Sequence, residues 1–224
     1  MRMSELGRRM FPLRGYLGIP FFLMVLWFCE PDPGLPSVVG WLLLLAGLAM
    51  RLWGVAGWVP RRLRVDAPPR LITEDGPYVY TRNPRYLGNL LLGLGGCQIA
   101  GLATCLLPYA VLWAVVHLPI IAHEEQTLLA RYGSEYAEYQ RRVPRFWGLS
   151  NRPFLPQFLP LRWDLAFCLE MATIAGWVSF GCYLQCWRWA HLGAPPQVYI
   201  AGLLVGGVFW LVLMATAHHL RQRL

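Results

Sequence analysis

The chain has 224 residues, of which 56% are hydrophobic and only 14% are charged, and its mean hydropathy is positive. This composition lies outside the range of soluble globular proteins and indicates a polytopic membrane protein. The formal net charge of +8 arises from arginine alone, because the sequence contains no lysine. The arginines cluster between apolar segments, where they indicate membrane orientation and attract anionic lipid, so the charge does not point to a nucleic acid partner.

Six apolar segments are predicted to cross the membrane as helices, since a span requires about 20 mainly apolar residues. In chain order they cover residues 16–28, 37–58, 87–103, 105–122, 163–187 and 198–219. Arg2, Arg8, Arg9 and Arg14 precede the first segment as they would in a signal peptide, but "CEPDPG" after it contains no small-residue cleavage site, and we expect a retained helix. The predicted fold is therefore an all-α, polytopic transmembrane bundle of about six spans.

The distribution of arginine predicts the orientation of these spans. Four arginines precede the first span, six lie at 61–85, six lie at 131–162 and two end the chain. A six-span arrangement places all of these on one side, which the positive-inside rule identifies as the cytoplasm. We therefore expect an integral membrane protein whose two termini and long loops, 60–86 and 123–162, are cytoplasmic.

Three units follow from this pattern: two N-terminal spans at 1–59, a core at 60–150 and a C-terminal hairpin at 151–224. The core combines a proline-rich loop, a hairpin of two spans joined near Thr104, and helical periodicity that Gly133 interrupts and Pro144 ends. We expect a cytoplasmic helix, a break and a second short helix after the fourth span. Because the hairpin crosses the membrane twice, residues 83–88 and the Glu124–Glu125 pair should meet on the cytoplasmic side.

Two polar motifs flank this hairpin. "GPYVYTRNPRYLG" at 76–88 contains three tyrosines and two arginines, and "EEQTLLARYGSEYAEYQRRVPRFW" at 124–147 begins with adjacent glutamates and adds further tyrosines and arginines. Adjacent carboxylates at the end of a membrane helix repel each other and lose hydration, so they are expected to find donors or cations. A ligand with a fixed positive charge and hydroxyl donors would satisfy them, and aromatic faces would stabilise its cation. The alternative is a solvated helix end beside an interfacial aromatic belt.

Taken together and in order, these motifs resemble the signature of the integral-membrane methyltransferases that include isoprenylcysteine carboxyl methyltransferase and the phospholipid N-methyltransferases. That pattern runs Gly-Pro-Tyr, Arg-His-Pro-x-Tyr-x-Gly, a hairpin, Glu-Glu, Phe/Tyr-Gly-x-x-Tyr-x-x-Tyr and Arg-Val-Pro, and the resemblance covers residues 76–147. One departure is Asn83, since carboxyl-methylating members commonly have His there and the phospholipid branch often has Asn. The ending "YQRRVP" instead resembles the carboxyl-methylating branch, so the acceptor stays open between a prenylcysteine-like carboxylate and a lipid amine.

The resemblance implies S-adenosylmethionine as cofactor, a lipophilic or lipidated acceptor, and no metal. The cofactor shell that it implies consists of Tyr80, Arg82, Asn83, Pro84, Tyr86, Glu124 and Glu125. Arg142 corresponds to the arginine of Arg-Val-Pro and is expected to orient the acceptor, because a guanidinium binds a carboxylate or phosphate bidentately. Glu125 is also a candidate base for an ammonium acceptor, which must lose a proton before methylation. His123 is the nearest histidine for that task.

Two other functions stay open at this stage. Sterol reductases share a similar C-terminal signature and use NADPH, although their chains are usually longer. A protein that keeps the scaffold as a binding or accessory module is the alternative without catalysis. Binding of labelled S-adenosylmethionine would discriminate among the three.

Several features have simpler interpretations. Gly93, Gly95 and Gly96 in "GLGG" resemble a nucleotide loop but lie within a span, and we expect them to allow close helix packing. Arg51, within the second span, is expected to snorkel to the cytoplasmic interface. The six cysteines lack the spacing of metal ligands and are interpreted as buried apolar residues.

Overall fold

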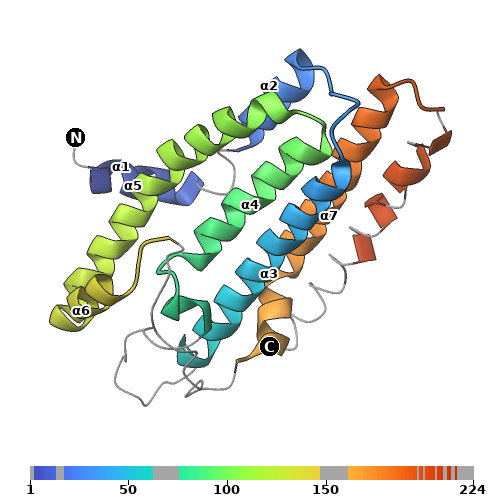
Figure 1. Cartoon of the computed structure of the whole chain (residues 1–224). Coiled ribbons are helices and arrows are strands. Elements are labelled where there is room, and N and C mark those ends of the chain that lie inside the picture. Colours follow the sequence, from blue (N-terminus) through green and yellow to red (C-terminus); the bar gives the residue numbers. More distant parts are fainter. Residues whose placement is uncertain are drawn as a thin grey trace.

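The computed structural model describes residues 3–13, 18–62, 76–146 and 161–195, together with short stretches between 197 and 215. The regular elements in these residues are all helical, which confirms the predicted all-α bundle (Figure 1). In chain order they are α1 (Met3–Met10), η1 (Phe11–Leu13), α2 (Ile19–Phe28), α3 (Ser37–Arg62), η2 (Gly76–Val79), α4 (Pro84–Ile99), η3 (Ala103–Cys105), α5 (Leu106–Tyr132), α6 (Ser134–Arg142) and α7 (Trp163–His191).

Three of the described helical segments are long and apolar enough to cross a membrane by length and composition. They are Ser37–Gly57, Ala103–Tyr132 and Trp163–His191. The predicted spans 16–28 and 87–103 correspond to shorter helices, α2 with 10 residues and α4 with 16. The last predicted span, 198–219, lies only partly within the described residues. Its described part contacts α7, because the hydroxyl of Ser179 donates a hydrogen bond to the carbonyl oxygen of Gly206 at 3.0 Å.

A helical hairpin is present at the predicted place. Its second helix, α5, also includes the separate helix that was expected to follow it. A turn at η3 joins α4 to α5, which continues without a break through Tyr132. Gly133, with φ of 55°, ends α5 and also precedes the first residue of α6, a backbone conformation that glycine adopts without strain. The polar motif at 124–132 is therefore part of the same rigid helix as the apolar span before it.

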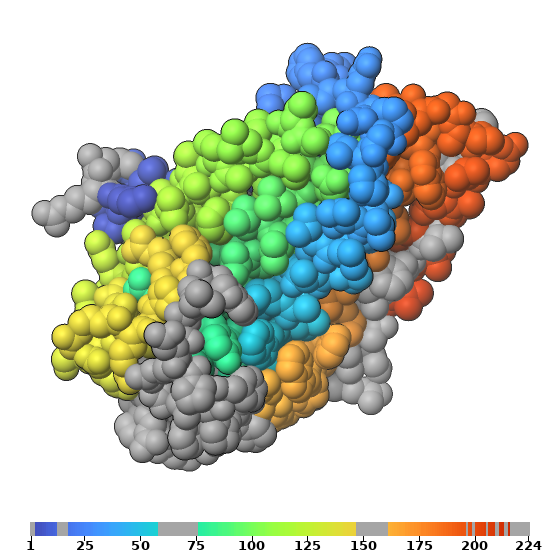
Figure 2. Space-filling view, in the orientation of Figure 1, coloured from blue at the N-terminus to red at the C-terminus, as the bar shows by residue number. Residues whose placement is uncertain are grey.

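Helices α3 and α4 are neighbours along one face of the molecule (Figure 2). They touch backbone to backbone through glycines. A Cβ atom on Gly47 would lie 2.8 Å from the carbonyl oxygen of Gly88, and one on Gly95 would lie 2.8 Å from that of Gly40. Side chains at these positions would force the two helices apart. The expectation that Gly95 in "GLGG" serves helix packing is confirmed.

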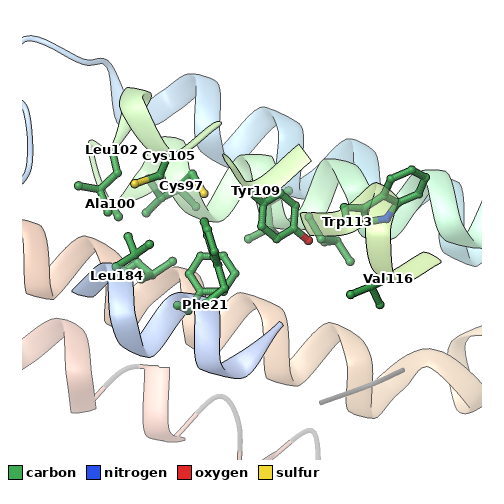
Figure 3. Packing of buried hydrophobic residues seen from close by; sticks show 14 of the residues in the cluster. Phe21, Cys97, Ala100, Leu102, Cys105, Tyr109, Trp113, Val116 and Leu184 are labelled. Carbon is green, nitrogen blue, oxygen red and sulfur yellow. The ribbon is translucent and has the colours of Figure 1, made fainter. Parts of the chain in front are cut away.

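The apolar core lies between the helices that surround this contact. Figure 3 shows Phe21 of α2, Cys97 of α4, Tyr109 and Trp113 of α5 and Leu184 of α7 converging in one cluster. The cysteines are free thiols, and three of the six are buried. Among the described residues, no group of His, Cys, Asp and Glu side chains is arranged to hold a metal ion.

The prediction that Arg51 snorkels to the membrane interface is wrong. Its side chain is only 11% exposed and pairs with the buried Glu170 of α7, with 2.7 Å between Nη2 and Oε2. The guanidinium also donates to the side-chain oxygen of Asn89 on α4. A carboxylate from a neighbouring helix thus neutralises the guanidinium, and these contacts join α3, α4 and α7.

The glycine contact gives a direct test of the packing. Gly47→Ala would place a methyl group against backbone atoms of α4, so we expect a loss of about 1–3 kcal/mol in unfolding free energy. Gly176→Ala on α7 is the matched control, because a Cβ there meets nothing within 4 Å and alanine favours the helix. Thermal unfolding of both variants in detergent would measure the difference, and equal melting temperatures would contradict the close contact.

Candidate functional site

Glu125, near the C-terminal end of α5, joins the two predicted motifs. Its buried carboxylate lies 3.1 Å from Nη1 of Arg82, with Oε1 as the nearest oxygen. Arg145, which follows α6, donates to the same carboxylate from Nη2 to Oε2 at 2.5 Å and from Nε to Oε1 at 3.3 Å. One carboxylate therefore binds two guanidinium groups from segments about sixty residues apart, and the expected meeting of the motifs is observed.

Hydrogen bonds to the backbone hold the same two segments together. The amide of Arg82 donates to the carbonyl oxygen of Pro144 at 3.0 Å. The carbonyl oxygen of Arg145 accepts from the Thr81 hydroxyl at 3.2 Å and from the Asn83 side-chain amide at 3.1 Å. Asn83 is buried, and its side chain thus fixes the position of Arg145. Donor groups at 81–83 meet carbonyl oxygens at 144–145, so the ion pairs form between pre-positioned partners.

Two tyrosines of α6 complete this contact. Tyr139 is buried and donates its hydroxyl to the carbonyl oxygen of Tyr78 at 2.9 Å. Tyr136, also buried, has its pKa raised to about 12, chiefly by burial and then by the negative charge of Glu125, against the opposing charge and hydrogen bond of Arg82. Its phenol therefore keeps its proton at alkaline pH, where an ordinary tyrosine begins to lose it.

The remaining residues of the predicted cofactor shell surround the start of α4. Pro84 is the buried first residue of this helix, where a missing amide hydrogen has no cost. Tyr86 is buried with its ring 5.5 Å from that of His117, and the ring of Tyr80 lies 6.2 Å from that of Trp53. Of the predicted aromatic residues, Tyr86 therefore faces α5 and Tyr80 faces α3.

Three other predicted residues have different surroundings. Glu124 lies close enough to Tyr136 to contribute weakly to its raised pKa. Arg142 is one third exposed on α6 and pairs with Glu138 one turn earlier, with 3.5 Å between the charged atoms. His123 packs edge-to-face against Phe11, with ring centroids 6.4 Å apart, and so contacts the N-terminal segment.

Arg82 has a hydrogen-bond donor that no described residue satisfies. Its Nε atom is buried and lacks a partner in the described part of the chain, although Nη1 faces Glu125. A buried donor without an acceptor is costly, and the cost is higher for a charged group. A carboxylate or another anionic acceptor would remove it, so Arg82 has the chemistry of a ligand-binding guanidinium.

A cavity of about 150 Å³ opens beside the ion pairs. It is lined by Ala122, Glu125, Gln126, Leu129, Gln140 and Arg145. Pockets for complete ligands measure roughly 300–1,000 Å³, so this cavity would hold only part of a nucleotide-sized molecule.

Arg145 and Tyr136 belong to this cluster, although the sequence did not assign either of them a role in the site. Both lie in the second motif, among several arginines and tyrosines that the sequence alone could not rank. The signal available in the sequence was amphipathic spacing. Tyr136 and Tyr139 are three residues apart and share one face of a short helix, and the other face carries Glu135, Glu138 and Arg141. That face had to pack against the preceding helix and bring the following Arg145 with it.

The chain is thus a helical membrane bundle with a buried glutamate–arginine site at the end of a hairpin. Comparison with known proteins shows which family this arrangement resembles. Residues 36–135 match the model of the phospholipid methyltransferase family. The predicted resemblance to the integral-membrane methyltransferases is confirmed. The matched segment contains α4, α5 and the first of the two motifs in full, but ends before Tyr136 and Arg145.

Two curated proteins are similar to parts of the chain. A protein-S-isoprenylcysteine O-methyltransferase of Schizosaccharomyces pombe is 33% identical over 87 residues, covering 38% of this chain and 34% of that protein. The cobalt-zinc-cadmium resistance protein CzcN of Cupriavidus metallidurans is 38% identical over 77 residues, covering 34% of each chain. The similarity therefore spans about a third of the length of these relatives. No solved structure matches the chain.

Glu125→Gln should lower stability far more than an equivalent surface change. Removing the carboxylate leaves two guanidinium groups without their counter-charge, one of them almost fully buried, and we expect a loss of about 3 kcal/mol. Glu138→Gln, whose half-exposed carboxylate also pairs with two arginines, should change stability by less than about 1 kcal/mol. Denaturation of both variants in detergent would show this difference; similar losses would mean that the buried site is not the stronger contact.

The raised pKa of Tyr136 predicts a loss of stability at alkaline pH. An unfolded tyrosine releases its proton near pH 10, whereas folded Tyr136 keeps it until about pH 12. The stabilising contribution is complete below pH 10 and is lost as pH rises toward 12. Melting temperatures across this interval should therefore fall less steeply for Tyr136→Phe than for the wild type, and parallel profiles would count against the assigned environment.

Proposed function

We propose that this protein transfers a methyl group from S-adenosylmethionine to a lipophilic acceptor at the membrane. The observation that carries the proposal is the Glu125 carboxylate, which draws Arg82 and Arg145 from the two ends of the methyltransferase-like signature into one buried cluster. The family match over residues 36–135 supports the same activity. The relative from Schizosaccharomyces pombe, an isoprenylcysteine O-methyltransferase, supports a lipidated acceptor.

The residues around Arg82 fit the chemical groups of this cofactor. Its unsatisfied, buried Nε donor suits the methionine carboxylate, and the neighbouring Glu124 suits an ammonium group or the ribose hydroxyls. The tyrosine rings at 80 and 86 suit adenine or a cation. When bound, S-adenosylmethionine supplies a methyl group on a positively charged sulfur, which the acceptor takes by in-line displacement.

The residues of this chain have distinct tasks in the proposed reaction. Glu125 is a positioning residue: with both oxygens engaged by arginines, it holds the guanidinium of Arg82 in place. Asn83 and Pro84 fix the turn that carries Arg82. Arg142, one third exposed on α6, would orient the acceptor. Positioning and exclusion of water then provide most of the rate enhancement.

The acceptor determines whether a base is required. A carboxylate is ionised near neutral pH and needs none, whereas an ammonium group must first lose a proton. Accepting that proton would remove the negative charge of Glu125 and so weaken its ion pairs with Arg82 and Arg145. The arrangement therefore favours an acceptor that arrives without a proton to lose. We further propose that the site faces the cytoplasm, which the arginine distribution supports.

Equilibrium binding of labelled S-adenosylmethionine to the purified chain in detergent tests the proposal. Arg82→Gln should weaken binding at least tenfold, because it removes the charge and the fork that face the ligand carboxylate. Arg141→Gln is the matched control, since it makes the same change at an exposed position of α6 and should leave the affinity unchanged.

Binding of NADPH in place of S-adenosylmethionine would contradict the proposal in favour of a reductase, and binding of neither would favour an accessory module. A methyl-transfer screen over prenylated thiols with free carboxylates, aminophospholipids and small thiols would then identify the acceptor class. Equal affinities of the wild type and Arg82→Gln for S-adenosylmethionine would show that Arg82 does not bind this cofactor.

A further inference from the structure

Two free thiols meet at the end of the bundle that lies opposite α6 in Figure 1. Cys29 caps the C-terminal end of α2, and Cys105 is the last residue of η3, in the turn between α4 and α5. Their sulfur atoms are 3.9 Å apart, within the range of a thiol hydrogen bond, although the two residues are 76 positions apart in the chain. Neither side chain has a part in the proposed methyl transfer.

The backbone around both cysteines is fixed by contacts that do not involve sulfur. The amide of Asp32, in the loop after α2, donates to the carbonyl oxygen of Gly101, in the turn after α4, at 2.9 Å. Arg188 of α7 is buried and donates from Nη2 to the carbonyl oxygen of Asp32 at 2.9 Å. Gly101 has φ of 77°, and a Cβ atom there would lie 3.1 Å from Nε of Arg188. The loop after Cys29 and the turn before Cys105 are therefore held side by side.

The two thiols differ in exposure. Cys29 is partly exposed, whereas Cys105 is 6% exposed. An oxidant in solution therefore reaches Cys29 first and leaves Cys105 to close the bond. The hydroxyl of Thr104 lies 4.0 Å from the Cys105 sulfur, where it can donate to the thiolate form. Cys97, which lies at the same end of the core cluster in Figure 3, is fully buried and so is shielded from an oxidant.

The predicted orientation of the chain places this pair on the oxidising side of the membrane. The arginine distribution predicts that the loop 29–36 faces away from the cytoplasm. Thiols in the cytoplasm are kept reduced, whereas compartments on the other side of a membrane support disulfides. A close pair of thiols at this end of the bundle is therefore a candidate for oxidation.

We propose that Cys29 and Cys105 form a reversible disulfide by exchange with a disulfide oxidant on the non-cytoplasmic side of the membrane. The Cys29 thiolate attacks one sulfur of the oxidant, which releases a first thiol and leaves a mixed disulfide. The Cys105 thiolate then attacks the Cys29 sulfur, so that the second thiol leaves and the intramolecular bond forms. Two protein thiols are oxidised, the oxidant is reduced to two thiols, and both protons pass to those thiols.

The bond requires a small rearrangement and would join distant parts of the chain. The two sulfurs must approach from 3.9 Å to about 2 Å, which rotation about the side-chain torsions can provide. The closed loop would contain α3 and α4 and would link the end of α2 to the α4–α5 turn. Because such a link restricts the unfolded chain, it would stabilise the bundle. The inference does not depend on methyl transfer.

Oxidised glutathione is the probe for the purified, reduced chain in detergent. We expect the wild type to lose two of its six free thiols, to yield a peptide that links Cys29 to Cys105 in mass spectrometry, and to recover all six on reduction. Cys29→Ser, a conservative change at a partly exposed position, should form no such link. Cys182→Ser is the matched control, because this cysteine is also partly exposed and stands four residues from a second thiol, Cys186, and the link should form as in the wild type.

Thermal unfolding tests the stabilising effect. The oxidised wild type should melt at least about 5 °C above the reduced wild type. Cys29→Ser should melt at the same temperature after both treatments. Equal melting temperatures for the oxidised and reduced wild type would overturn the stabilising effect.

The absence of a disulfide in the treated wild type would overturn the proposal. A bond between another pair, such as Cys97 and Cys105, or a link between two chains would also overturn it. Alkylation of thiols in acid-quenched cells that express the chain tests the compartment. The Cys29–Cys105 bond should already be present in those cells, and fully reduced thiols would overturn its assignment to the oxidising side.

Discussion

The arrangement of this protein's candidate site depends on one buried carboxylate bound by two guanidinium groups. Burying Glu125 would be prohibitive without counter-charges, and only the segments around Arg82 and Arg145 supply them among the described residues. To meet that requirement, the loop before α4 and the segment after α6 must both fold against the end of α5. Backbone hydrogen bonds between these segments then fix their register.

The glycine contact between α3 and α4 has a related consequence at the same end of the bundle. The stem of Arg51 crosses α4 at Gly88, where no side chain stands in its way, and its guanidinium reaches Glu170. The α4 N-terminus therefore sends Arg82 toward one glutamate and Arg85 toward another. One short motif thereby serves two ionic clusters, each with one buried carboxylate between two arginines.

Much of this could be predicted from the sequence, because apolar length and motif order are local signals. The long spans, the hairpin and the approach of the first motif to Glu125 follow from periodicity and connectivity. The partners in the ion pairs could not be predicted in this way. Arg51 and Glu170 are 119 residues apart and lie on helices whose rotation the sequence leaves undefined. Likewise, the choice of Arg145 over its neighbours depends on how α6 turns at Gly133.

A double-mutant cycle between Glu125 and Arg82 tests the central interaction most directly. Unfolding free energies of Glu125→Gln, Arg82→Gln and the double variant would give the coupling between the two side chains, free of their separate effects. A direct, buried ion pair predicts a coupling of about 1–3 kcal/mol, with the double variant less destabilised than the sum of the single variants. Additive effects would show that the carboxylate does not hold Arg82 and would contradict the account of the site.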